Sequence, residues 1–128
     1  MTQSLEDYLE MVSLLDDEGP VRVTDLASRL GVSKPSAHAA LRALEGQGLL
    51  SHERYRSVIL SAEGRRRAAS IRERHSMLAA FLRDVVGVSP ETADSDACKM
   101  EHHLSAETLE KMRAIVKTKR ATAGKAAG

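Results

Sequence analysis

The sequence has few aromatic residues and almost no cysteine. Among 128 residues there are one Phe, two Tyr, no Trp and one Cys. Proteins that bind single-stranded nucleic acids stack bases on aromatic rings, so this composition argues against a single-stranded partner and leaves duplex DNA. The one cysteine, Cys98, has no partner for a disulfide within the chain. It is therefore a packed thiol, a reactive thiol, a cross-link between chains or a metal ligand.

Long apolar runs are also missing. No segment approaches the roughly 20 apolar residues needed to cross a bilayer, and the first residues, MTQSLEDYLEMV, lack a basic leader before an apolar run. We therefore expect a cytoplasmic protein with no membrane partner. A chain of 128 residues can bury one core, or two small cores that share an interface, which excludes a large multidomain enzyme.

The formal net charge is only +1, but the charges are clustered along the chain. Acidic residues crowd residues 6–18, whereas basic residues crowd 54–67 and 117–120. Local clustering, rather than the sum, decides whether a protein binds nucleic acid. The basic segments are therefore candidate contacts for a phosphate backbone.

The first half of the chain shows the pattern of a helix-turn-helix. Apolar residues at helical spacing predict a helix over 4–18, and a short edge strand is expected over 21–23. Thr24 is expected to cap a second helix over 25–30, and Ser33 a third. On the outward side of this third helix, the side chains are short near the N-terminus and basic further along. A helix that enters the major groove needs this pattern. Its candidate DNA contacts are Ser33, Lys34, Pro35, Ser36, His38, Ala39 and Arg42.

A β-hairpin is predicted after the third helix. Residues 49–53 and 58–60 are typical of two strands, and the segment between them is basic. At the tip of such a wing, Arg54 and Arg56 would contact phosphates and contribute affinity rather than base identity. The wing completes a winged helix-turn-helix.

The second half is predicted to be helical. Ser61 is expected to cap a long helix that ends near residue 86, and Ser89 with Pro90 a helix that ends near residue 103. A last helix ends near residue 119, and the low-complexity tail over 120–128 is expected to be disordered. The predicted fold class is therefore mainly α with a small β-hairpin wing.

Three residues that can bind a metal share one face of a predicted helix. Cys98, Glu101 and His102 stand at positions i, i+3 and i+4, so a thiolate, a carboxylate and an imidazole lie within reach of one ion. Asp7 and Glu10 are similarly paired on the first helix, and His75 is a further candidate ligand. Solvated acidic pairs, surface histidines and buried inert thiols are the commoner roles of such residues. The C-x-x-E-H triplet favours the metal site.

The order of these elements resembles the diphtheria-toxin-repressor family of metalloregulators. The most similar segments are S-L-E-D-Y-L-E over residues 4–10, E-R-Y-R-S-V-I-L-S-A-E-G over 53–64, R-H-S-M-L over 74–78 and E-H-H-L-S over 101–105. The resemblance implies a homodimeric repressor of metal-uptake genes that binds a palindromic DNA operator when it carries Mn(II) or Fe(II). It also implies a winged-helix domain over 1–70 and a helical metal-binding and dimerisation domain over 71–119.

Within the family, the resemblance favours the manganese-sensing branch. Its ligands match a set of five residues here, namely Asp7, Glu10, His75, Glu101 and His102. Cys98 instead matches the iron-sensing branch, but that branch's ancillary Glu and His are replaced by Ala79 and Asp94, and its SH3-like domain is missing. Mn(II) is the first choice of corepressor and Fe(II), which a thiolate favours, the second. An ion held between the first helix and the triplet would fix the spacing of the two recognition helices in a dimer.

Two alternatives belong to other functional classes. One is a winged-helix regulator that responds to an oxidant or an organic ligand, with Cys98 as the switch. The other is a metalloenzyme that activates water at the same cluster. An enzyme is disfavoured because the sequence has no HExxH motif, nucleophile elbow or phosphate-binding glycine loop.

Overall fold

The chain folds as two compact units, Met1–Ile71 and Arg72–Gly128. The computed structural model describes residues 3–52 and 57–127, with the side chains of Gln3 and of residues 123–127 excepted. The boundary between the units falls inside helix α4, one residue beyond the expected boundary after residue 70. Among the described residues, none of the helices is both long enough and apolar enough to cross a membrane.

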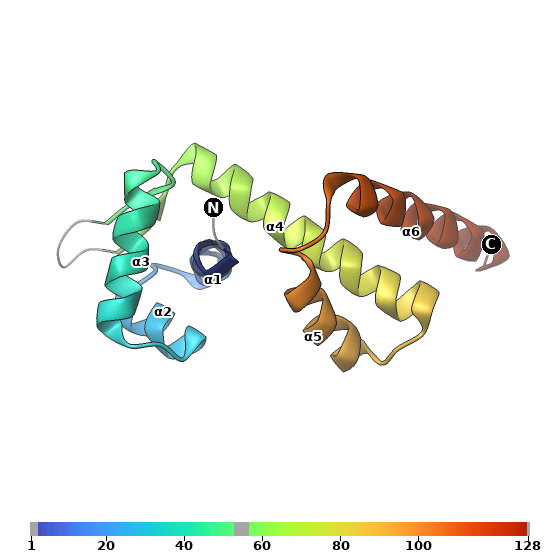
Figure 1. Cartoon of the computed structure of the whole chain (residues 1–128), viewed down its shortest axis with the longest axis horizontal. Coiled ribbons are helices and arrows are strands. Elements are labelled where there is room, and N and C mark those ends of the chain that lie inside the picture. Colours follow the sequence, from blue (N-terminus) through green and yellow to red (C-terminus); the bar gives the residue numbers. More distant parts are fainter. Residues whose placement is uncertain (1–2, 53–56, 128) are drawn as a thin grey trace. The chain divides into compact units, whose positions relative to one another are not determined.

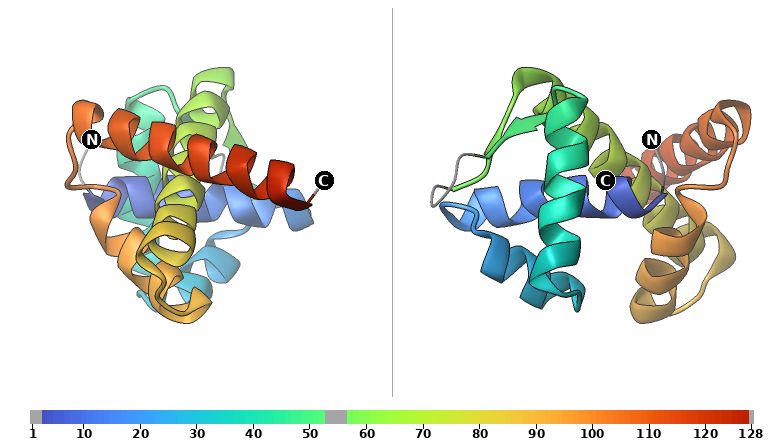
Figure 2. Two further views of the ribbon diagram at one scale, coloured as in Figure 1. Left: turned by 90° about the vertical axis from the view of Figure 1, so that its right-hand side faces the viewer. Right: turned by 60° about the vertical axis from the view of Figure 1, so that its left-hand side comes forward.

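The first unit is a three-helix bundle followed by a β-hairpin (Figure 1). Its elements are α1 (Gln3–Glu18), α2 (Val23–Leu30), α3 (Lys34–Gly46), β1 (Leu50–Ser51), β2 (Ile59–Leu60) and the beginning of α4 (Ala62–Phe81). The strands are antiparallel, with Leu50 opposite Leu60, and Val21 adds an isolated bridge to Val58. Figure 2 (right) shows α3 crossing α1. This arrangement confirms the predicted winged helix-turn-helix.

The core of the first unit comes from every element. Leu9 and Val12 of α1, Leu26 of α2 and Leu44 of α3 have no exposed surface, and Leu49 seals the start of the hairpin. On α3, Ala37, Leu41 and Leu44 are buried on the side away from the candidate DNA contacts, and Val32 packs against the same core. The apolar spacing therefore predicted the buried side of α3 correctly.

The serine caps are confirmed, but the predicted threonine cap is wrong. Ser33 Oγ accepts a hydrogen bond from the backbone N–H of Ser36 (3.2 Å), and Ser61 Oγ accepts one from Gly64 (3.0 Å). Thr24, by contrast, lies inside α2, whose N-cap is Arg22 in an extended conformation. The bridge between Val21 and Val58 holds the chain extended up to Arg22, so the helix begins before the polar residue.

The second unit is helical. It contains the rest of α4, a π-helical segment η1 (Leu82–Val86), α5 (Pro90–Met100) and α6 (Ala106–Ala127). Its core is formed by a separate cluster of buried side chains: Met77, Leu78, Ala79, Ala80, Ala97, Leu109 and Val116. Of the two possibilities that the chain length allowed, one core or two small ones, the described residues thus form two cores.

Three helix ends differ from the sequence predictions. The long helix is α-helical only to Phe81, after which the Gly87 N–H bonds to the Leu82 carbonyl across five residues. Helix α5 ends at Met100 rather than near residue 103, because the His103 N–H turns back to the Met100 carbonyl (3.0 Å). The last helix continues to Ala127, past its predicted end near residue 119 and into the expected disordered tail. Its many alanines have the highest helix propensity.

Gly64 allows α4 to start directly against the hairpin. A Cβ at this position would lie 1.9 Å from the Leu49 carbonyl oxygen, where real atoms never come so close. We expect Gly64→Ala to lower the free energy of unfolding by about 1–3 kcal/mol or more, because the strand backbone must move. Gly46→Ala on α3, where a Cβ meets open space, is the control and should be neutral or stabilising by up to about 1 kcal/mol. Urea unfolding followed by circular dichroism measures both, and equal stabilities would contradict the predicted clash.

An ion pair links α4 to α6 within the second unit. Arg113 donates two hydrogen bonds to the carboxylate of Glu73, both at 2.8 Å, and these bonds lower the pKa of Glu73 below its ordinary value of 4.5. A carboxyl whose pKa is lowered by folding adds stability above the unfolded value, and this stability is lost as the pH falls through the folded value.

We therefore expect Glu73→Gln to destabilise the protein at neutral pH by less than about 1 kcal/mol, because both side chains are partly exposed and solvent screens the pair. The difference from wild type should stay constant above pH 4.5 and shrink below it. Thermal unfolding across a pH series measures this, with Glu107→Gln, which removes an exposed carboxylate from the first turn of α6, as the control. A difference that grows as the pH falls would have the wrong sign.

Candidate metal centre and nucleic-acid interface

Three of the predicted metal ligands meet in the second unit around the carboxylate of Glu101. Glu101 is the residue after α5, still in helical conformation, and its side chain has no exposed surface. One carboxylate oxygen lies 3.2 Å from Nδ1 of His75 on α4, and the other lies 3.2 Å from Nε2 of His102. A buried carboxylate thus has an imidazole nitrogen against each oxygen, which is a set of oxygen and nitrogen donors suited to a divalent cation.

The other ring nitrogen of His75 contacts a residue that the sequence did not single out as a ligand. Nε2 of His75 lies 2.6 Å from Oδ1 of Asp94 on α5. Sequence analysis noted Asp94 only as a departure from the iron-sensing branch. A signal was nevertheless present, because Asp94 and Glu101 stand seven residues apart, which places them two turns apart on one helix face.

The predicted triplet does not lie on one continuous helix. Because α5 ends at Met100, Cys98 is helical whereas His102 belongs to the following turn. Glu101 keeps helical geometry, since its N–H bonds to the Ala97 carbonyl at 3.0 Å. Cys98 is exposed, so the alternative of a buried inert thiol is wrong.

Asp7 and Glu10 belong to the first unit. They stand one turn apart on α1, and both are half-buried. Their immediate neighbours Tyr8 and Leu9 are buried in the core of that unit, so the backbone that carries the two carboxylates is firmly held. Carboxylates on a rigid element can serve as preorganised ligands.

The candidate DNA-binding face of α3 is exposed as predicted. All seven residues proposed for it are exposed, from the N-cap Ser33 to Arg42 in the third turn, and the buried side chains of α3 lie on its other side. The side chains are small near the N-terminus of the helix, which lets its backbone approach a groove closely. Arg54 and Arg56, predicted for the tip of the wing, lie outside the described residues.

A second histidine joins this surface. The rings of His38 on α3 and His52, directly after β1, are stacked, with centroids 5.8 Å apart and an angle of 27° between their planes. The His52 N–H also donates to the carboxylate of Glu45 on α3 (3.1 Å). These contacts hold the base of the hairpin against α3. Sequence reasoning missed His52, because nothing local to it indicates its partner.

The three consecutive arginines at the start of α4 form ion pairs within the protein. Arg65 pairs with Asp16 of α1 (3.0 Å), while Arg66 and Arg67 both contact Glu63. The hydrogen bonds from Arg66 and then Arg67 lower the pKa of Glu63. Two carboxylates, Asp16 and Glu63, offset part of the charge of these three arginines, so the arginines add less positive charge to the surface than the sequence suggested.

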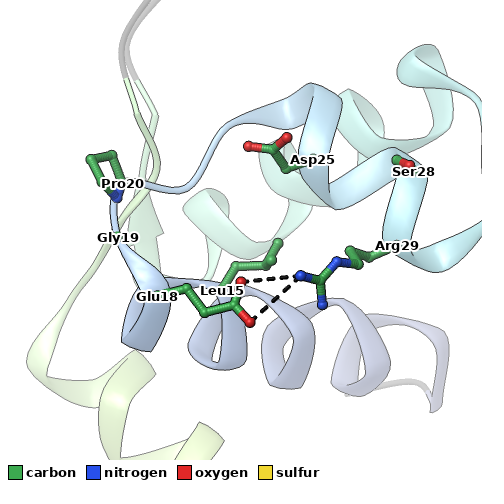
Figure 3. Close-up of a pocket in the computed structure, with 7 residues that line it drawn as sticks. All are labelled: Leu15, Glu18, Gly19, Pro20, Asp25, Ser28 and Arg29. Atoms are coloured by element: carbon green, nitrogen blue, oxygen red, sulfur yellow. Dashed lines mark hydrogen bonds and ion pairs between the residues drawn. The ribbon is translucent and has the colours of Figure 1, made fainter.

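A pocket of about 340 Å³ lies between α1 and α2 (Figure 3). Glu18 and Arg29 pair beside it at 3.1 Å, and its lining includes Pro20, Asp25 and Ser28. None of the residues that line it was predicted for the metal centre or for DNA contact. It therefore carries no part of the candidate site.

The second unit also exposes an apolar groove of about 370 Å³ along α6. Val85 of η1 and Ile115 of α6 contribute its apolar surface, and Val86 beside them is 57% exposed. Exposed apolar residues that lie together in this way form a candidate surface for contact with another protein.

Two family models match nearly the whole chain. Residues 1–58 match the N-terminal DNA-binding domain of iron-dependent repressors, and residues 61–121 match the metal-binding and dimerisation domain of the same repressors. The chain therefore belongs to the iron-dependent repressor family, which confirms its resemblance to the diphtheria-toxin-repressor family. Members of this family are DNA-binding regulators and not enzymes, as the sequence indicated, and the oxidant- or ligand-sensing alternative is not favoured.

Curated relatives point to one branch of that family. Over 110 residues the chain is 46% identical to the transcriptional regulator MntR of Escherichia coli O157:H7, a match that covers 85% of this chain and 70% of the relative. It is 34% identical to the HTH-type transcriptional regulator MntR of Listeria monocytogenes, covering 90% and 81%. It is also 37% identical to an uncharacterised HTH-type regulator of Methanocaldococcus jannaschii, covering 88% and 92%.

Solved structures agree with the sequence matches. A manganese-dependent transcriptional repressor in complex with manganese superimposes with a TM-score of 0.81 at 30% identity, covering 88% of this chain. The chain spans about half, 52%, of that protein's length. The metal-dependent regulator MtsR superimposes with a TM-score of 0.82 at 21% identity, which supports the fold.

The accessibility of the Cys98 thiol can be tested directly by its reaction with a reagent in solution. We expect the metal-free native protein to react with a colorimetric disulfide reagent at a rate close to that of the unfolded chain, because the thiol is exposed and is the sole cysteine. The absorbance of the released thiolate measures the reaction, and Cys98→Ser gives the blank. Release of one equivalent only after denaturant is added would show that the thiol is buried.

Proposed function

We propose that this protein is a cytoplasmic repressor whose homodimer binds a palindromic DNA operator when Mn(II) occupies its metal centre. The observation that carries the proposal is the buried Glu101 carboxylate with an imidazole nitrogen 3.2 Å from each oxygen. It lies in the part of the chain that matches a metal-binding and dimerisation domain. The proposed domains are 1–70 for DNA binding and 71–119 for metal binding and dimerisation.

The donor set supports Mn(II) as the first choice. The proposed ligands are Asp7, Glu10, His75, Cys98, Glu101 and His102. Carboxylates are hard donors that suit Mn(II), while the imidazoles are accepted by several divalent metals. The relatives named above as MntR and the manganese-bound repressor structure support the same choice. The Cys98 thiolate is the one soft donor, and it makes Fe(II) the second choice.

The proposed ligands come from two units, which suggests how metal binding controls DNA binding. Asp7 and Glu10 would join the ion from α1, next to the recognition helix, whereas His75, Glu101 and His102 belong to the dimerisation domain. The ion supplies the positive charge that offsets several carboxylates in one place. Once both sets of ligands are engaged, the position of each recognition helix relative to the dimer is fixed.

The apolar groove beside Val85 and Ile115 is the proposed dimer surface. A second copy would cover these exposed apolar side chains, and a two-fold axis would pair the groove with itself. The two α3 helices would then enter major grooves one helical turn of DNA apart, or a multiple of it. The small and basic residues of α3 would contact bases, and Arg54 and Arg56 would contact phosphates.

Metal-dependent DNA binding tests the proposal. The probe is a duplex selected from a random pool in the presence of Mn(II), and its affinity is measured with and without Mn(II) by fluorescence anisotropy. We expect Mn(II) to raise the affinity of the wild type by about 5- to 150-fold for each bound ion, the usual range of coupling between two ligands. Glu101→Gln should abolish this increase, because the central carboxylate is lost.

The matched control is Glu107→Gln, which removes an exposed carboxylate in the first turn of α6. It should retain the full response to Mn(II). The proposal is wrong if wild type binds the selected duplex equally well after chelation of Mn(II), or if Glu101→Gln responds to Mn(II) as the wild type does.

A further inference from the structure

His75 lies between two carboxylates, one at each ring nitrogen. Nδ1 is 3.2 Å from Oε2 of Glu101, and Nε2 is 2.6 Å from Oδ1 of Asp94. All three residues belong to the second unit. A neutral imidazole carries one N–H donor and one lone pair, whereas an ionised carboxylate only accepts hydrogen bonds. His75 can therefore donate to only one of its two carboxylates in the neutral form.

The two distances indicate which nitrogen holds the proton. The 2.6 Å contact to Asp94 has the length of a strong hydrogen bond to a charged acceptor, whereas 3.2 Å is at the long end of the range for N–H···O bonds. The proton therefore belongs on Nε2, where it is donated to Asp94. The lone pair on Nδ1 then faces the buried carboxylate of Glu101.

The same two distances distinguish two atoms that could bind one metal ion from two atoms that share a hydrogen bond. Two adjacent ligand atoms in an octahedral site, each about 2.1 Å from the ion, lie about 3 Å apart. The 3.2 Å between Nδ1 of His75 and Glu101 fits two ligands of one cation, and the 2.6 Å between Nε2 and Asp94 is too short for that. The geometry thus assigns different tasks to the two carboxylates.

We propose that Asp94 is a positioning residue of the metal centre, which holds His75 in the Nε2–H form so that Nδ1 binds the metal. This inference rests on the proposed function, because it takes His75 as a ligand. A hydrogen-bonded carboxylate behind a ligating histidine fixes the ring's orientation and makes the metal-binding nitrogen more basic. Removing such a partner commonly weakens metal binding by about 10- to 100-fold.

Helix α5 brings both carboxylates to the same ring. Its N-terminus is fixed by Ser89, whose Oγ accepts a hydrogen bond from the Thr92 N–H at 3.2 Å. Ala97, between Asp94 and Glu101 in sequence, has no exposed surface and anchors the helix in the core. The Asp94 side chain is 74% exposed, so replacing it should leave the fold intact.

The first measurement is the tautomer of His75 in the metal-free full-length protein. Nitrogen–proton correlation spectra of histidine-labelled protein, recorded where imidazoles are neutral and assigned with His75→Gln, distinguish the two tautomers. We expect the Nε2–H form in wild type and in Asp96→Ala, which removes the same charge from a neighbouring position of α5. Asp94→Ala should give a mixture, and Asp94→Asn, which keeps an oxygen acceptor, should restore part of the preference.

The second measurement is Mn(II) binding in the absence of DNA, followed by the electron paramagnetic resonance signal of free Mn(II). Asp94→Ala should bind the same number of ions about 10- to 100-fold more weakly, Asp96→Ala should match wild type, and Asp94→Asn should lie between them. The conservative variant separates a hydrogen-bond role from loss of charge, because a pure charge effect would make Asp94→Asn as weak as Asp94→Ala.

The possible results distinguish this inference from the proposed function. If wild type and Asp96→Ala do not bind Mn(II), the proposed function is wrong. If wild type binds Mn(II) and Asp94→Ala matches it in affinity or in tautomer, the role assigned to Asp94 is wrong. Loss of a whole ion from the stoichiometry of Asp94→Ala would make Asp94 a ligand and would also overturn the inference.

Discussion

The buried carboxylate of Glu101 is the constraint on which the metal centre depends. Transferring an ionised carboxylate out of water costs several kcal/mol, even after the protein relaxes around it. An apolar side chain of similar size at this position would avoid that cost. Two imidazoles against the carboxylate offset part of the cost, and a cation would offset more. The buried carboxylate therefore lowers stability, and the proposed metal ion would account for its presence at this position.

The contacts of His75 join two helices that share one core. Ala80 on α4 and Ala97 on α5 have no exposed surface and belong to one cluster. His75 of α4 contacts Asp94 of α5 and Glu101, the residue after α5. A bulkier residue at either alanine would displace its neighbours in this core, because packed interiors have no room for added volume.

The sequence predicted those features that depend on local chemistry. The serine caps at Ser33 and Ser61 and the buried side of α3 follow from residues within a few positions of each other. The start of α2 was missed because it depends on a bridge from Val21 to Val58, far along the chain. The contact between His75 and Asp94 was missed for the same reason, since it joins two helices whose register only tertiary packing sets. The sequence was enough to propose the ligands, whereas it gave no reason to place Asp94 against His75.

Three of the proposed ligands, Asp7, Glu10 and His75, lie close in sequence to buried core residues, and this affects how an ion would couple the two units. Asp7 and Glu10 flank Tyr8 and Leu9, which are buried in the first core, and His75 is followed by Met77 and Leu78 of the second. A ligand held in this way cannot move toward an ion without moving the core behind it, because packed cores resist deformation. In the proposed site, the free energy of metal binding would therefore change the position of whole units rather than of single side chains. A set of exposed, mobile ligands could bind the same ion and transmit nothing to the recognition helix.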